Sequence, residues 1–254
     1  MLTKKIVKYI QSLSHKKFRD EEAAFIVEGP KVVAEFLLSK KFDCRLICAE
    51  KNWLFENEIL IRGISSENIY GVDENWLQRI SLLKTAHKVV AVFNKSLPVP
   101  EPVFKNKIAL MLDDIQDPGN LGTIIRNADW FGIENIICSR NCADCYNPKV
   151  VQSSMGSLSR VDIFYSDLIS FIEKNSSVKV YAAALSGTSV FEMDKIREGI
   201  ILIGNESKGI HEDLLKLSHK RITIPCIGHA ESLNAAVACG IILSHVLHVA
   251  QSPR

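Results

Sequence analysis

The sequence predicts an α/β protein built on a parallel sheet, with a smaller α/β unit at its amino-terminal end. Two observations support this fold class. Short apolar runs alternate with helical patterns along the chain, which is typical of a sheet covered by helices on both faces. In addition, an apolar run, a glycine-containing loop and a helical pattern follow one another over residues 108–132, 200–210 and 222–243.

The amino-terminal third has the alternating pattern of a small α/β unit. A proline at the first helical position favours a helix from Pro30 to Ser39. The other expected helices span Lys4–Ser12, Trp53–Leu60 and Glu74–Leu83, and the expected strands span Ala24–Val27, Arg45–Cys48, Ile69–Val72 and Val89–Phe93.

Residues 96–106 are expected to link two domains, at 1–95 and 107–254, because alternating prolines favour an extended, semi-rigid chain. A last helix is expected from Ser232 to about Val249. The strands expected before it span Ile108–Leu112, Asn135–Cys138, Val161–Tyr165, Lys179–Ala184, Ile200–Ile203 and Arg221–Ile224.

Composition places the chain among globular proteins. It has 254 residues, of which 47% are hydrophobic and 24% charged, enough for two domains. No apolar run reaches the roughly 20 residues of a membrane span, and the first residues lack the apolar stretch of a signal peptide. Seven cysteines without a paired spacing fit a reducing compartment. We therefore expect a cytoplasmic protein.

The net charge is only +2, yet the first 19 residues contain six basic residues and no acidic one. Such a cluster can bind phosphates, because each neutralised phosphate releases counterions. It can equally be a solvated helix face. The candidate RNA-binding residues of this amino-terminal arm are Lys4, Lys5, Lys16, Lys17 and Arg19.

The loop after the first apolar run of the second domain has clear turn chemistry. Asp117-Pro118-Gly119 has proline and glycine at the central turn positions, and Asn120 follows where a helix N-cap is expected. The loop should bring Asn120 and Arg126 to the carboxyl end of a strand, where open α/β sheets bind ligands.

Three sets of residues in these loops carry a family resemblance. The sets are Asn120, Gly122 and Arg126; Gly204-Asn205-Glu206 with Lys208-Gly209; and Ile224-Pro225 with Ser232-Leu233-Asn234. In order and spacing the chain resembles the SpoU (TrmH-type) RNA ribose methyltransferases of the SPOUT superfamily. The resemblance covers Ile108 to about Val249, and Phe25–Leu38 also resembles an L30e-like RNA-binding domain.

The resemblance implies a trefoil knot in the parallel-sheet domain, a homodimer, and S-adenosylmethionine as cofactor without a metal. It assigns the catalytic positions to Arg126, Asn120, Glu206, Ser232 and Asn234. It assigns the cofactor-binding positions to Ala184, Leu202, Gly204, Ile224, Cys226, Leu233 and Ala235. The glycines would let backbone approach the ligand closely.

The implied reaction moves a methyl group from a sulfonium to a ribose 2'-hydroxyl, which must be placed in line and lose its proton. The family assigns activation of this hydroxyl to the arginine at position 126. A guanidinium has five donors and no acceptor, so Arg126 can also anchor a phosphate and stabilise the developing alkoxide.

The function expected is an RNA 2'-O-methyltransferase acting on 23S rRNA, with tRNA as the alternative substrate and no binding of DNA or membranes. A non-catalytic RNA-binding protein of the same fold is a further alternative. Some positions depart from the family pattern: Gln152 replaces an arginine, Ala235-Ala236 replaces Val-Ser, and His87-Lys88 replaces Gln-Gly.

Two other motifs invite different chemistry. Cys138, Cys142 and Cys145 have the C-x3-C-x2-C spacing of radical S-adenosylmethionine enzymes, but the residue before the last cysteine is Asp144. Asp113-Asp114-x-x-Asp117 resembles a magnesium-diphosphate motif, but it follows a strand and precedes a turn. We interpret the cysteines as structural and the acids as turn-forming residues. His211 with the two acids after it is expected to start a helix.

Overall fold

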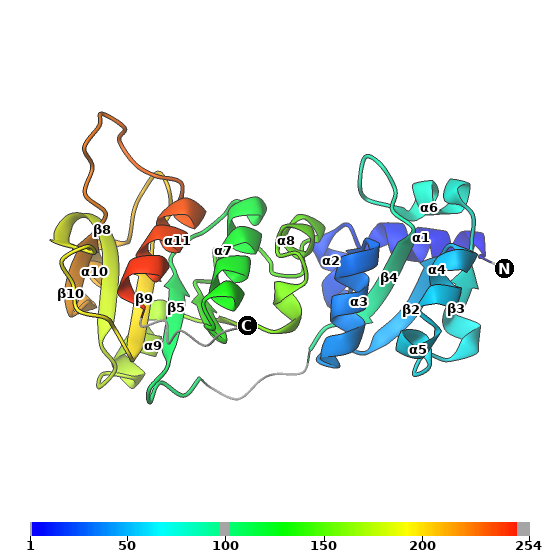
Figure 1. Ribbon diagram of the computed structural model, residues 1–254, viewed down its shortest axis with the longest axis horizontal. Helices are drawn as coiled ribbons and strands as arrows, with labels where there is room; N and C mark the ends of the chain where they lie inside the picture. The colour runs from blue at the N-terminus through cyan, green and yellow to red at the C-terminus, as the bar shows by residue number, and fades with distance from the viewer. Residues whose placement is uncertain (1, 97–101, 248–254) are drawn as a thin grey trace. The chain divides into compact units, whose positions relative to one another are not determined.

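The computed structural model describes residues 2–96 and 102–247 and divides into two compact units (Figure 1). The amino-terminal unit comprises residues 2–96 together with residues 144–160, and the second unit comprises residues 102–143 and 161–247. Residues 97–101 of the expected linker lie outside the described part of the chain. Among the helices described, none is long and apolar enough to cross a membrane.

A four-stranded sheet with the order β1-β4-β2-β3 forms the amino-terminal unit. β4 pairs antiparallel with both β1 and β2, and β3 pairs parallel with β2. These strands span Ala24–Glu28 (β1), Cys44–Ala49 (β2), Ile69–Gly71 (β3) and Val89–Asn94 (β4). The helices are α1 (Lys4–Ser12), α2 (Lys16–Glu21), α3 (Pro30–Ser39), α4 (Lys51–Glu56), α5 (Glu58–Ile61) and α6 (Glu74–Ile80), with a short 3-10 turn at Ser66–Asn68. The small α/β unit is therefore confirmed.

Two of the expected helices differ in the structure. The helix expected at Trp53–Leu60 is interrupted at Asn57, whose side-chain amide donates to the Trp53 carbonyl, 2.9 Å away. The helix expected to reach Leu83 ends at Ile80, because the residues after it bond to Glu28 instead. The Ser81 hydroxyl and the Leu82 amide both donate to the Glu28 carboxylate, at 2.5 and 2.8 Å.

The basic amino-terminal segment is a folded part of this unit, and the helix expected at Lys4–Ser12 is α1. Ile10 and Leu13 are fully buried in a core shared with α6 and the sheet. Arg19 is also buried, and it donates to Asp144 at 2.7 Å and to the carbonyls of Leu13 and Ser14. Arg19 is therefore occupied inside the protein, whereas the lysines of the cluster are exposed.

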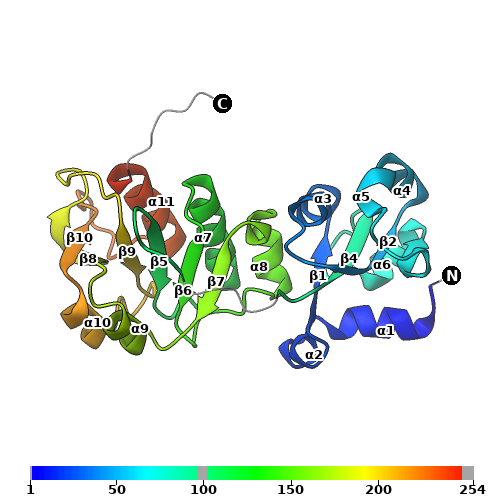
Figure 2. The same ribbon diagram turned by 90° about the horizontal axis from the view of Figure 1, so that it is seen from below.

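A six-stranded parallel sheet with the order β10-β8-β9-β5-β6-β7 forms the second unit, as predicted. Figure 2 shows α7 (Pro118–Trp130) and α11 (Ala235–Val246) on one face and α9 (Leu168–Lys174) and α10 (Glu212–Leu217) on the other. The strands span Ile108–Leu112 (β5), Asn135–Cys138 (β6), Asp162–Tyr165 (β7), Val180–Ser189 (β8), Gly199–Ile203 (β9) and Lys220–Thr223 (β10).

Two helix starts and one strand of this unit differ from the sequence-based expectations. Asp117, not Asn120, caps α7 by accepting from the Asn120 amide at 2.9 Å. Asn234, not Ser232, caps α11 by accepting from the amides of Ala236 and Val237. β8 continues to Ser189, because β10 pairs with both of its ends across a register shift. The helix expected after His211 is confirmed as α10.

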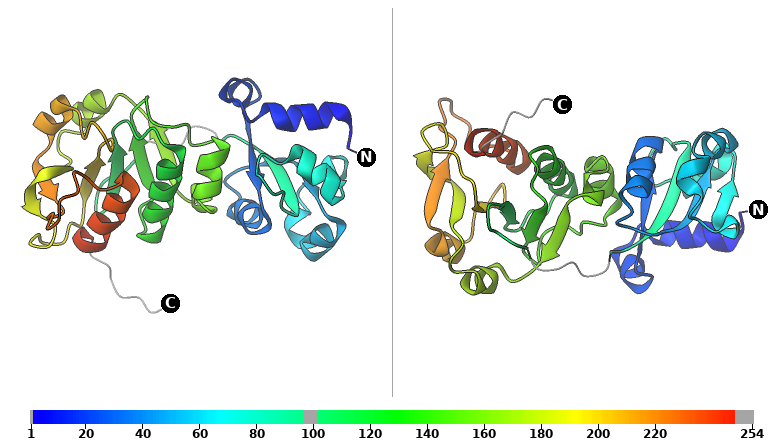
Figure 3. Two further views of the ribbon diagram at one scale, coloured as in Figure 1. Left: turned by 90° about the horizontal axis from the view of Figure 1, so that it is seen from above. Right: turned by 60° about the horizontal axis from the view of Figure 1, so that its bottom comes forward.

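Residues 144–160, which follow β6 in sequence, belong to the amino-terminal unit. They form α8 (Pro148–Ser153) and a short 3-10 turn at Ser157–Ser159. α8 packs against β1, which lies at the edge of its sheet, and covering an edge strand removes a site for unwanted pairing. Figure 3 shows the same elements from two further directions.

Three contacts fix this segment. The Asp144 carboxylate accepts from Arg19, and the Tyr146 ring lies 4.8 Å from the Phe25 ring. Burial raises the pKa of Tyr146 to about 12. At Gly156, where φ is +94°, a Cβ would lie 2.9 Å from the Cβ of Glu35, so only glycine permits this close approach.

We predict that Asp144→Ala lowers the free energy of unfolding by about 3 kcal/mol, because it leaves a buried guanidinium without its anion. Lys16→Ala is the matched control. It removes the exposed Lys16–Asp20 pair and should cost less than about 1 kcal/mol. Urea unfolding of the two variants measures the difference, and equal losses would contradict a structural role for the buried pair.

Candidate active site at the carboxyl edge of the parallel sheet

Three loops of the second unit meet through the side chain of Asn120. Its amide nitrogen donates to the Glu206 carboxylate, and its amide oxygen accepts from Asn234 at 2.9 Å. Asn120 lies in the first turn of α7, Glu206 follows β9, and Asn234 precedes α11. The structure therefore joins three of the five predicted catalytic residues in one hydrogen-bonded chain.

The ends of this chain are held by their own loops. Asn234 uses its oxygen to cap α11 and its amide nitrogen to reach Asn120. Between α7 and α11, the Asn127 side chain also donates to the Ala236 carbonyl at 2.9 Å. This contact pins the two helices to each other beside the site.

The loop that carries Glu206 is a tight turn closed by two backbone hydrogen bonds between Asn205 and Gly209, at 3.0 and 2.9 Å. The side-chain oxygen of Asn205, Oδ1, accepts from the backbone amides of Ser207 and Lys208 inside the turn. Gly204 lies under it, and a Cβ at Gly204 would lie 2.4 Å from the Gly209 carbonyl carbon. From the sequence we expected Gly204 to allow close approach of a ligand. The structure shows that the turn itself requires a glycine at this position.

Asp113 and Asp114, the two residues directly after β5, hold this turn and the residues that follow it. The buried Asp113 carboxylate accepts from the His211 backbone amide at 2.8 Å and lies within hydrogen-bond distance of His211 Nδ1. The Asp114 carbonyl accepts from the Asn205 side chain at 2.8 Å. Sequence reasoning missed these anchoring roles, although the adjacent acids at the end of a strand were the available signal.

The same acids could hold a metal only by giving up these bonds. Ligand atoms of Asp113, Asp114 and His211 lie within 4.8 Å of one another. The Asp114 carboxylate, however, accepts from the Ser139 hydroxyl at 2.7 Å and from Asn141, and Asp113 is engaged by His211. The arrangement is satisfied as a hydrogen-bonded network.

The other two predicted catalytic residues lie outside the hydrogen-bonded chain. Arg126 is exposed on α7, and no hydrogen bond or ion pair of its guanidinium is found among residues 2–96 and 102–247. Ser232 lies in a segment, 225–234, in which every residue is exposed. Both side chains are accessible to a substrate.

The predicted cofactor positions fall into two groups. Leu202 is fully buried in the core beneath the sheet, where its side chain packs in the cluster shared with α9 and α10. Its side chain is therefore a core contact and not a surface on which a ligand would lie. Of the remaining positions, one lies within β8, just after the residues that pair with β9, and the others follow β9, follow β10 or start α11. They are Ala184, Gly204, Ile224, Cys226, Leu233 and Ala235.

Cys138 and Cys142 are part of the packing around β5 and β6, whereas Cys145 belongs to the amino-terminal unit. All three cysteines are buried, and Cys142 Sγ accepts from the Ile115 amide and donates to the Leu112 carbonyl, both at 3.3 Å. Hydrogen bonds, chiefly from Cys138, lower the pKa of Cys142. These contacts account for Cys142 as a structural residue.

We predict a pH dependence at the Asp113–His211 pair. The hydrogen bond to Asp113, followed by its charge, raises the pKa of His211 above the ordinary value of 6.5, with Asp114 adding to this and Lys208 opposing it. The contribution of the pair to stability is therefore present below pH about 6.5 and is lost as the pH rises through the folded-state pKa. Asp113→Asn should lower the NMR titration midpoint of His211.

Glu212→Gln is the control, because it removes a neighbouring carboxylate at the start of α10 that does not contact His211. A His211 midpoint that is unchanged by Asp113→Asn in folded protein, or that shifts equally with Glu212→Gln, would contradict the proposed pairing.

Comparison with known proteins agrees with this geometry. Residues 107–244 match the SpoU rRNA Methylase family, and residues 4–91 match the MRM3-like substrate binding domain. The chain is 30% identical to the 23S rRNA (guanosine(2553)-2'-O)-methyltransferase RlmP of Bacillus subtilis, over 94% of this chain and 95% of that protein.

Two solved structures are similar over nearly the whole chain. A TrmH-family protein from Porphyromonas gingivalis has 35% identity and a TM-score of 0.82, covering 97% of this chain and 98% of that one. An AdoMet-bound rRNA methyltransferase from Sinorhizobium meliloti has 30% identity and a TM-score of 0.85, covering 97% and 95%. The three loops joined at Asn120 are thus those of a methylase domain, and the chain belongs to the SpoU rRNA methylase family.

Proposed function

We propose that this protein transfers a methyl group from S-adenosylmethionine to a ribose 2'-hydroxyl of 23S rRNA. The observation that carries the proposal is the chain Glu206–Asn120–Asn234 with the accessible Arg126 on the same helix as Asn120. The family match, the relative named for 23S rRNA and the AdoMet-bound neighbour support it. Transfer RNA is the alternative substrate, and methylation of the two transcripts side by side distinguishes them.

The residues at the carboxyl edge fit an S-adenosylmethionine molecule. The segment 225–234 is exposed throughout, and its apolar residues include Ile227, which is fully exposed, and Leu233, which is 45% exposed. Apolar surface beside accessible backbone groups suits an adenine and a methionine moiety. When bound there, the cofactor supplies the electrophilic methyl group of its sulfonium.

Residues of this chain then act on the ribose. Arg126 donates to the 2'-oxygen and the neighbouring phosphate, and so stabilises the negative charge that develops as the hydroxyl loses its proton. Glu206 is the member of the hydrogen-bonded chain that can accept a proton, whereas Asn120 and Asn234 orient it. Ser232 lies two residues before Asn234 and would contact ribose or cofactor.

Several features support the finer parts of the proposal. Trp130 of α7 and Val237 of α11 are 68% and 51% exposed, and large exposed apolar side chains on two adjacent helices fit a homodimer interface. Lys4, Lys5, Lys16 and Lys17 are exposed and suit RNA phosphates. We also propose that the second and third loops form a trefoil knot. The proposed location of the protein is the cytoplasm.

We predict that the protein binds S-adenosylmethionine with one site per chain in calorimetry. Leu233→Asp should weaken this affinity by at least about tenfold, since it replaces an apolar contact by a charge that must be desolvated. Ile169→Asp, the same change on an exposed position of α9, is the control. Absence of binding by the unaltered protein, with or without RNA, would contradict the cofactor assignment.

We predict that Arg126→Ala stays folded and binds cofactor but loses at least about 100-fold in the single-turnover rate of methyl transfer, because donors to a developing oxyanion act in the transition state. Thr123→Ala, one turn earlier on the exposed side of α7, is the control. A near-normal rate for Arg126→Ala would remove Arg126 from the catalytic set.

The dimer proposal predicts complementation between two inactive variants. If Arg126 of one subunit serves the cofactor site of its partner, mixing Arg126→Ala with Leu233→Asp creates one site with both an intact arginine and an intact cofactor loop. Methylation should partly return once subunit exchange is verified by mass. No return of activity in verified heterodimers would contradict the shared site.

A further inference from the structure

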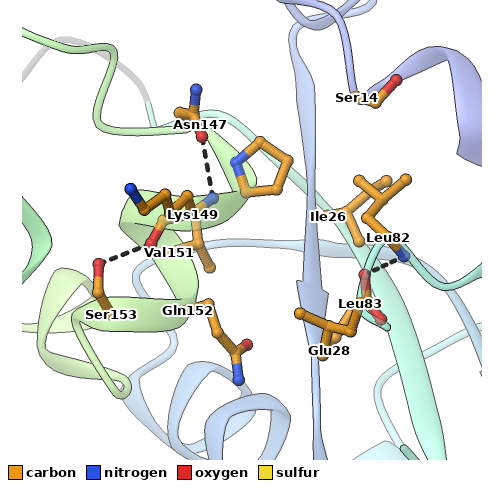
Figure 4. Close-up of a pocket in the computed structure, with 11 residues that line it drawn as sticks. Ser14, Ile26, Glu28, Leu82, Leu83, Asn147, Lys149, Val151, Gln152 and Ser153 are labelled. Atoms are coloured by element: carbon orange, nitrogen blue, oxygen red, sulfur yellow. Dashed lines mark hydrogen bonds between the residues drawn. The ribbon is translucent and has the colours of Figure 1, made fainter. Parts of the chain in front are cut away.

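A cavity of about 560 Å³ lies within the amino-terminal unit, between α8 and the edge of the four-stranded sheet. One wall consists of Ile26, Leu82 and Leu83, and the facing wall of Pro148 and Val151 on α8. Figure 4 shows the two walls on either side of an open slot. The volume falls within the range of about 300–1,000 Å³ that is typical of small-molecule sites.

The polar residues that line the slot lie at both of its ends, with Ser14 and Asn147 at the upper end and Glu28 and Gln152 at the lower end in Figure 4. Gln152 is half-buried, and its side-chain amide makes no hydrogen bond within the described part of the chain. In Figure 4 this amide is directed along the slot, while Lys149 and Ser153 point away from it. Gln152 thus offers two donors and an acceptor beside apolar walls.

Glu28 fixes the wall opposite α8. It is 5% exposed, and its carboxylate accepts from the Ser81 hydroxyl and the Leu82 amide at 2.5 and 2.8 Å. These bonds hold the turn that presents Leu82 and Leu83 to the slot. The wall is therefore built into the fold and does not depend on a ligand for its position.

We propose that this slot binds an unpaired nucleobase of the substrate RNA, stacked between the Leu82–Leu83 wall and Pro148–Val151, with its polar edge at the Gln152 amide. The proposal rests on the proposed function, since it assumes that the substrate is RNA. A flat group with two apolar faces and a hydrogen-bonding edge matches both the walls and the amide. Unpaired RNA bases are commonly bound by stacking on flat side chains, and here the two aliphatic walls would cover the faces of the base instead.

Charge in the adjacent helices favours the same ligand. Ser14, which lines the slot, lies in the connection between α1 and α2, the two helices that carry the exposed lysines at positions 4, 5, 8, 16 and 17. A polyanion with a base in the slot would have its backbone near a basic surface, which raises its affinity at low salt.

The experiment measures anisotropy of the full-length protein with a fluorescein-labelled, single-stranded RNA of mixed sequence and about 12 nucleotides. Leu83→Trp fills the slot from a half-buried position and so excludes the base from both apolar walls, which should lower affinity by at least about tenfold. Gln152→Ala should lower it about fivefold, as expected for one lost hydrogen bond. Ser153→Ala is the matched control, because Ser153 borders the same slot but its hydroxyl donates to the Lys149 carbonyl at 2.6 Å and is not directed into the slot.

Folding of each variant is verified by circular dichroism and by calorimetric binding of S-adenosylmethionine, which involves the other unit. Unchanged RNA affinity in both Leu83→Trp and Gln152→Ala would overturn the proposal, and so would an effect of Ser153→Ala equal to theirs. A changed oligomeric state with unchanged RNA affinity would assign the slot to a protein contact and also overturn it.

Failure of the proposed function gives a different result. If the unaltered protein binds the RNA and the slot variants weaken that binding, but no 2'-O-methyl group is formed on any transcript, the slot proposal stands and the enzymatic one fails. Conversely, normal methylation with unaltered RNA affinity in the slot variants rejects the slot alone.

Discussion

The candidate site depends on one side chain that donates and accepts at the same time. Asn120 gives a hydrogen bond to Glu206 and receives one from Asn234. An amide is suited to this position, because a carboxylate has no donor and an ammonium has no acceptor. Three segments that are far apart in the sequence are thereby held in one arrangement, and Arg126 reaches solvent from the same helix.

The strand β5 supplies the support beneath that arrangement. It lies in the interior of the six-stranded sheet, and the residues directly after it, Asp113 and Asp114, anchor the turn that carries Glu206. A few residues further on, Asp117 starts α7 and so fixes the direction of Asn120. One short stretch of chain thus controls the backbone of two of the three loops.

Much of this organisation could be predicted from local sequence. The bounds of β5, β6 and α3 follow from apolar runs and from the proline that starts α3, and the meeting of Asn120 with Glu206 follows from loops at one edge of a parallel sheet. The capping residues were harder, since Asp117 and Asn120, or Ser232 and Asn234, have equally suitable side chains. Only the backbone conformation selects between them.

Contacts between distant positions outside the three loops could not be predicted. In the sequence Arg19 belongs to a basic cluster. In the structure it is buried and paired with Asp144, which lies 125 positions away. The pairing of Asp113 with His211 spans 98 positions. Gly204 shows the same limit, because its necessity comes from the backbone of Gly209 and not from its neighbours in sequence.

The division of the chain has a consequence for synthesis on the ribosome. The amino-terminal unit needs residues 144–160 to cover the β1 edge and to give Arg19 its anion. At roughly 5–20 residues per second, the interval between completing β4 and completing that segment lasts on the order of 3–13 seconds. During this time Arg19 lacks its anion and the β1 edge lacks its cover, so the amino-terminal unit cannot complete its fold until residues of the second half of the chain have been made.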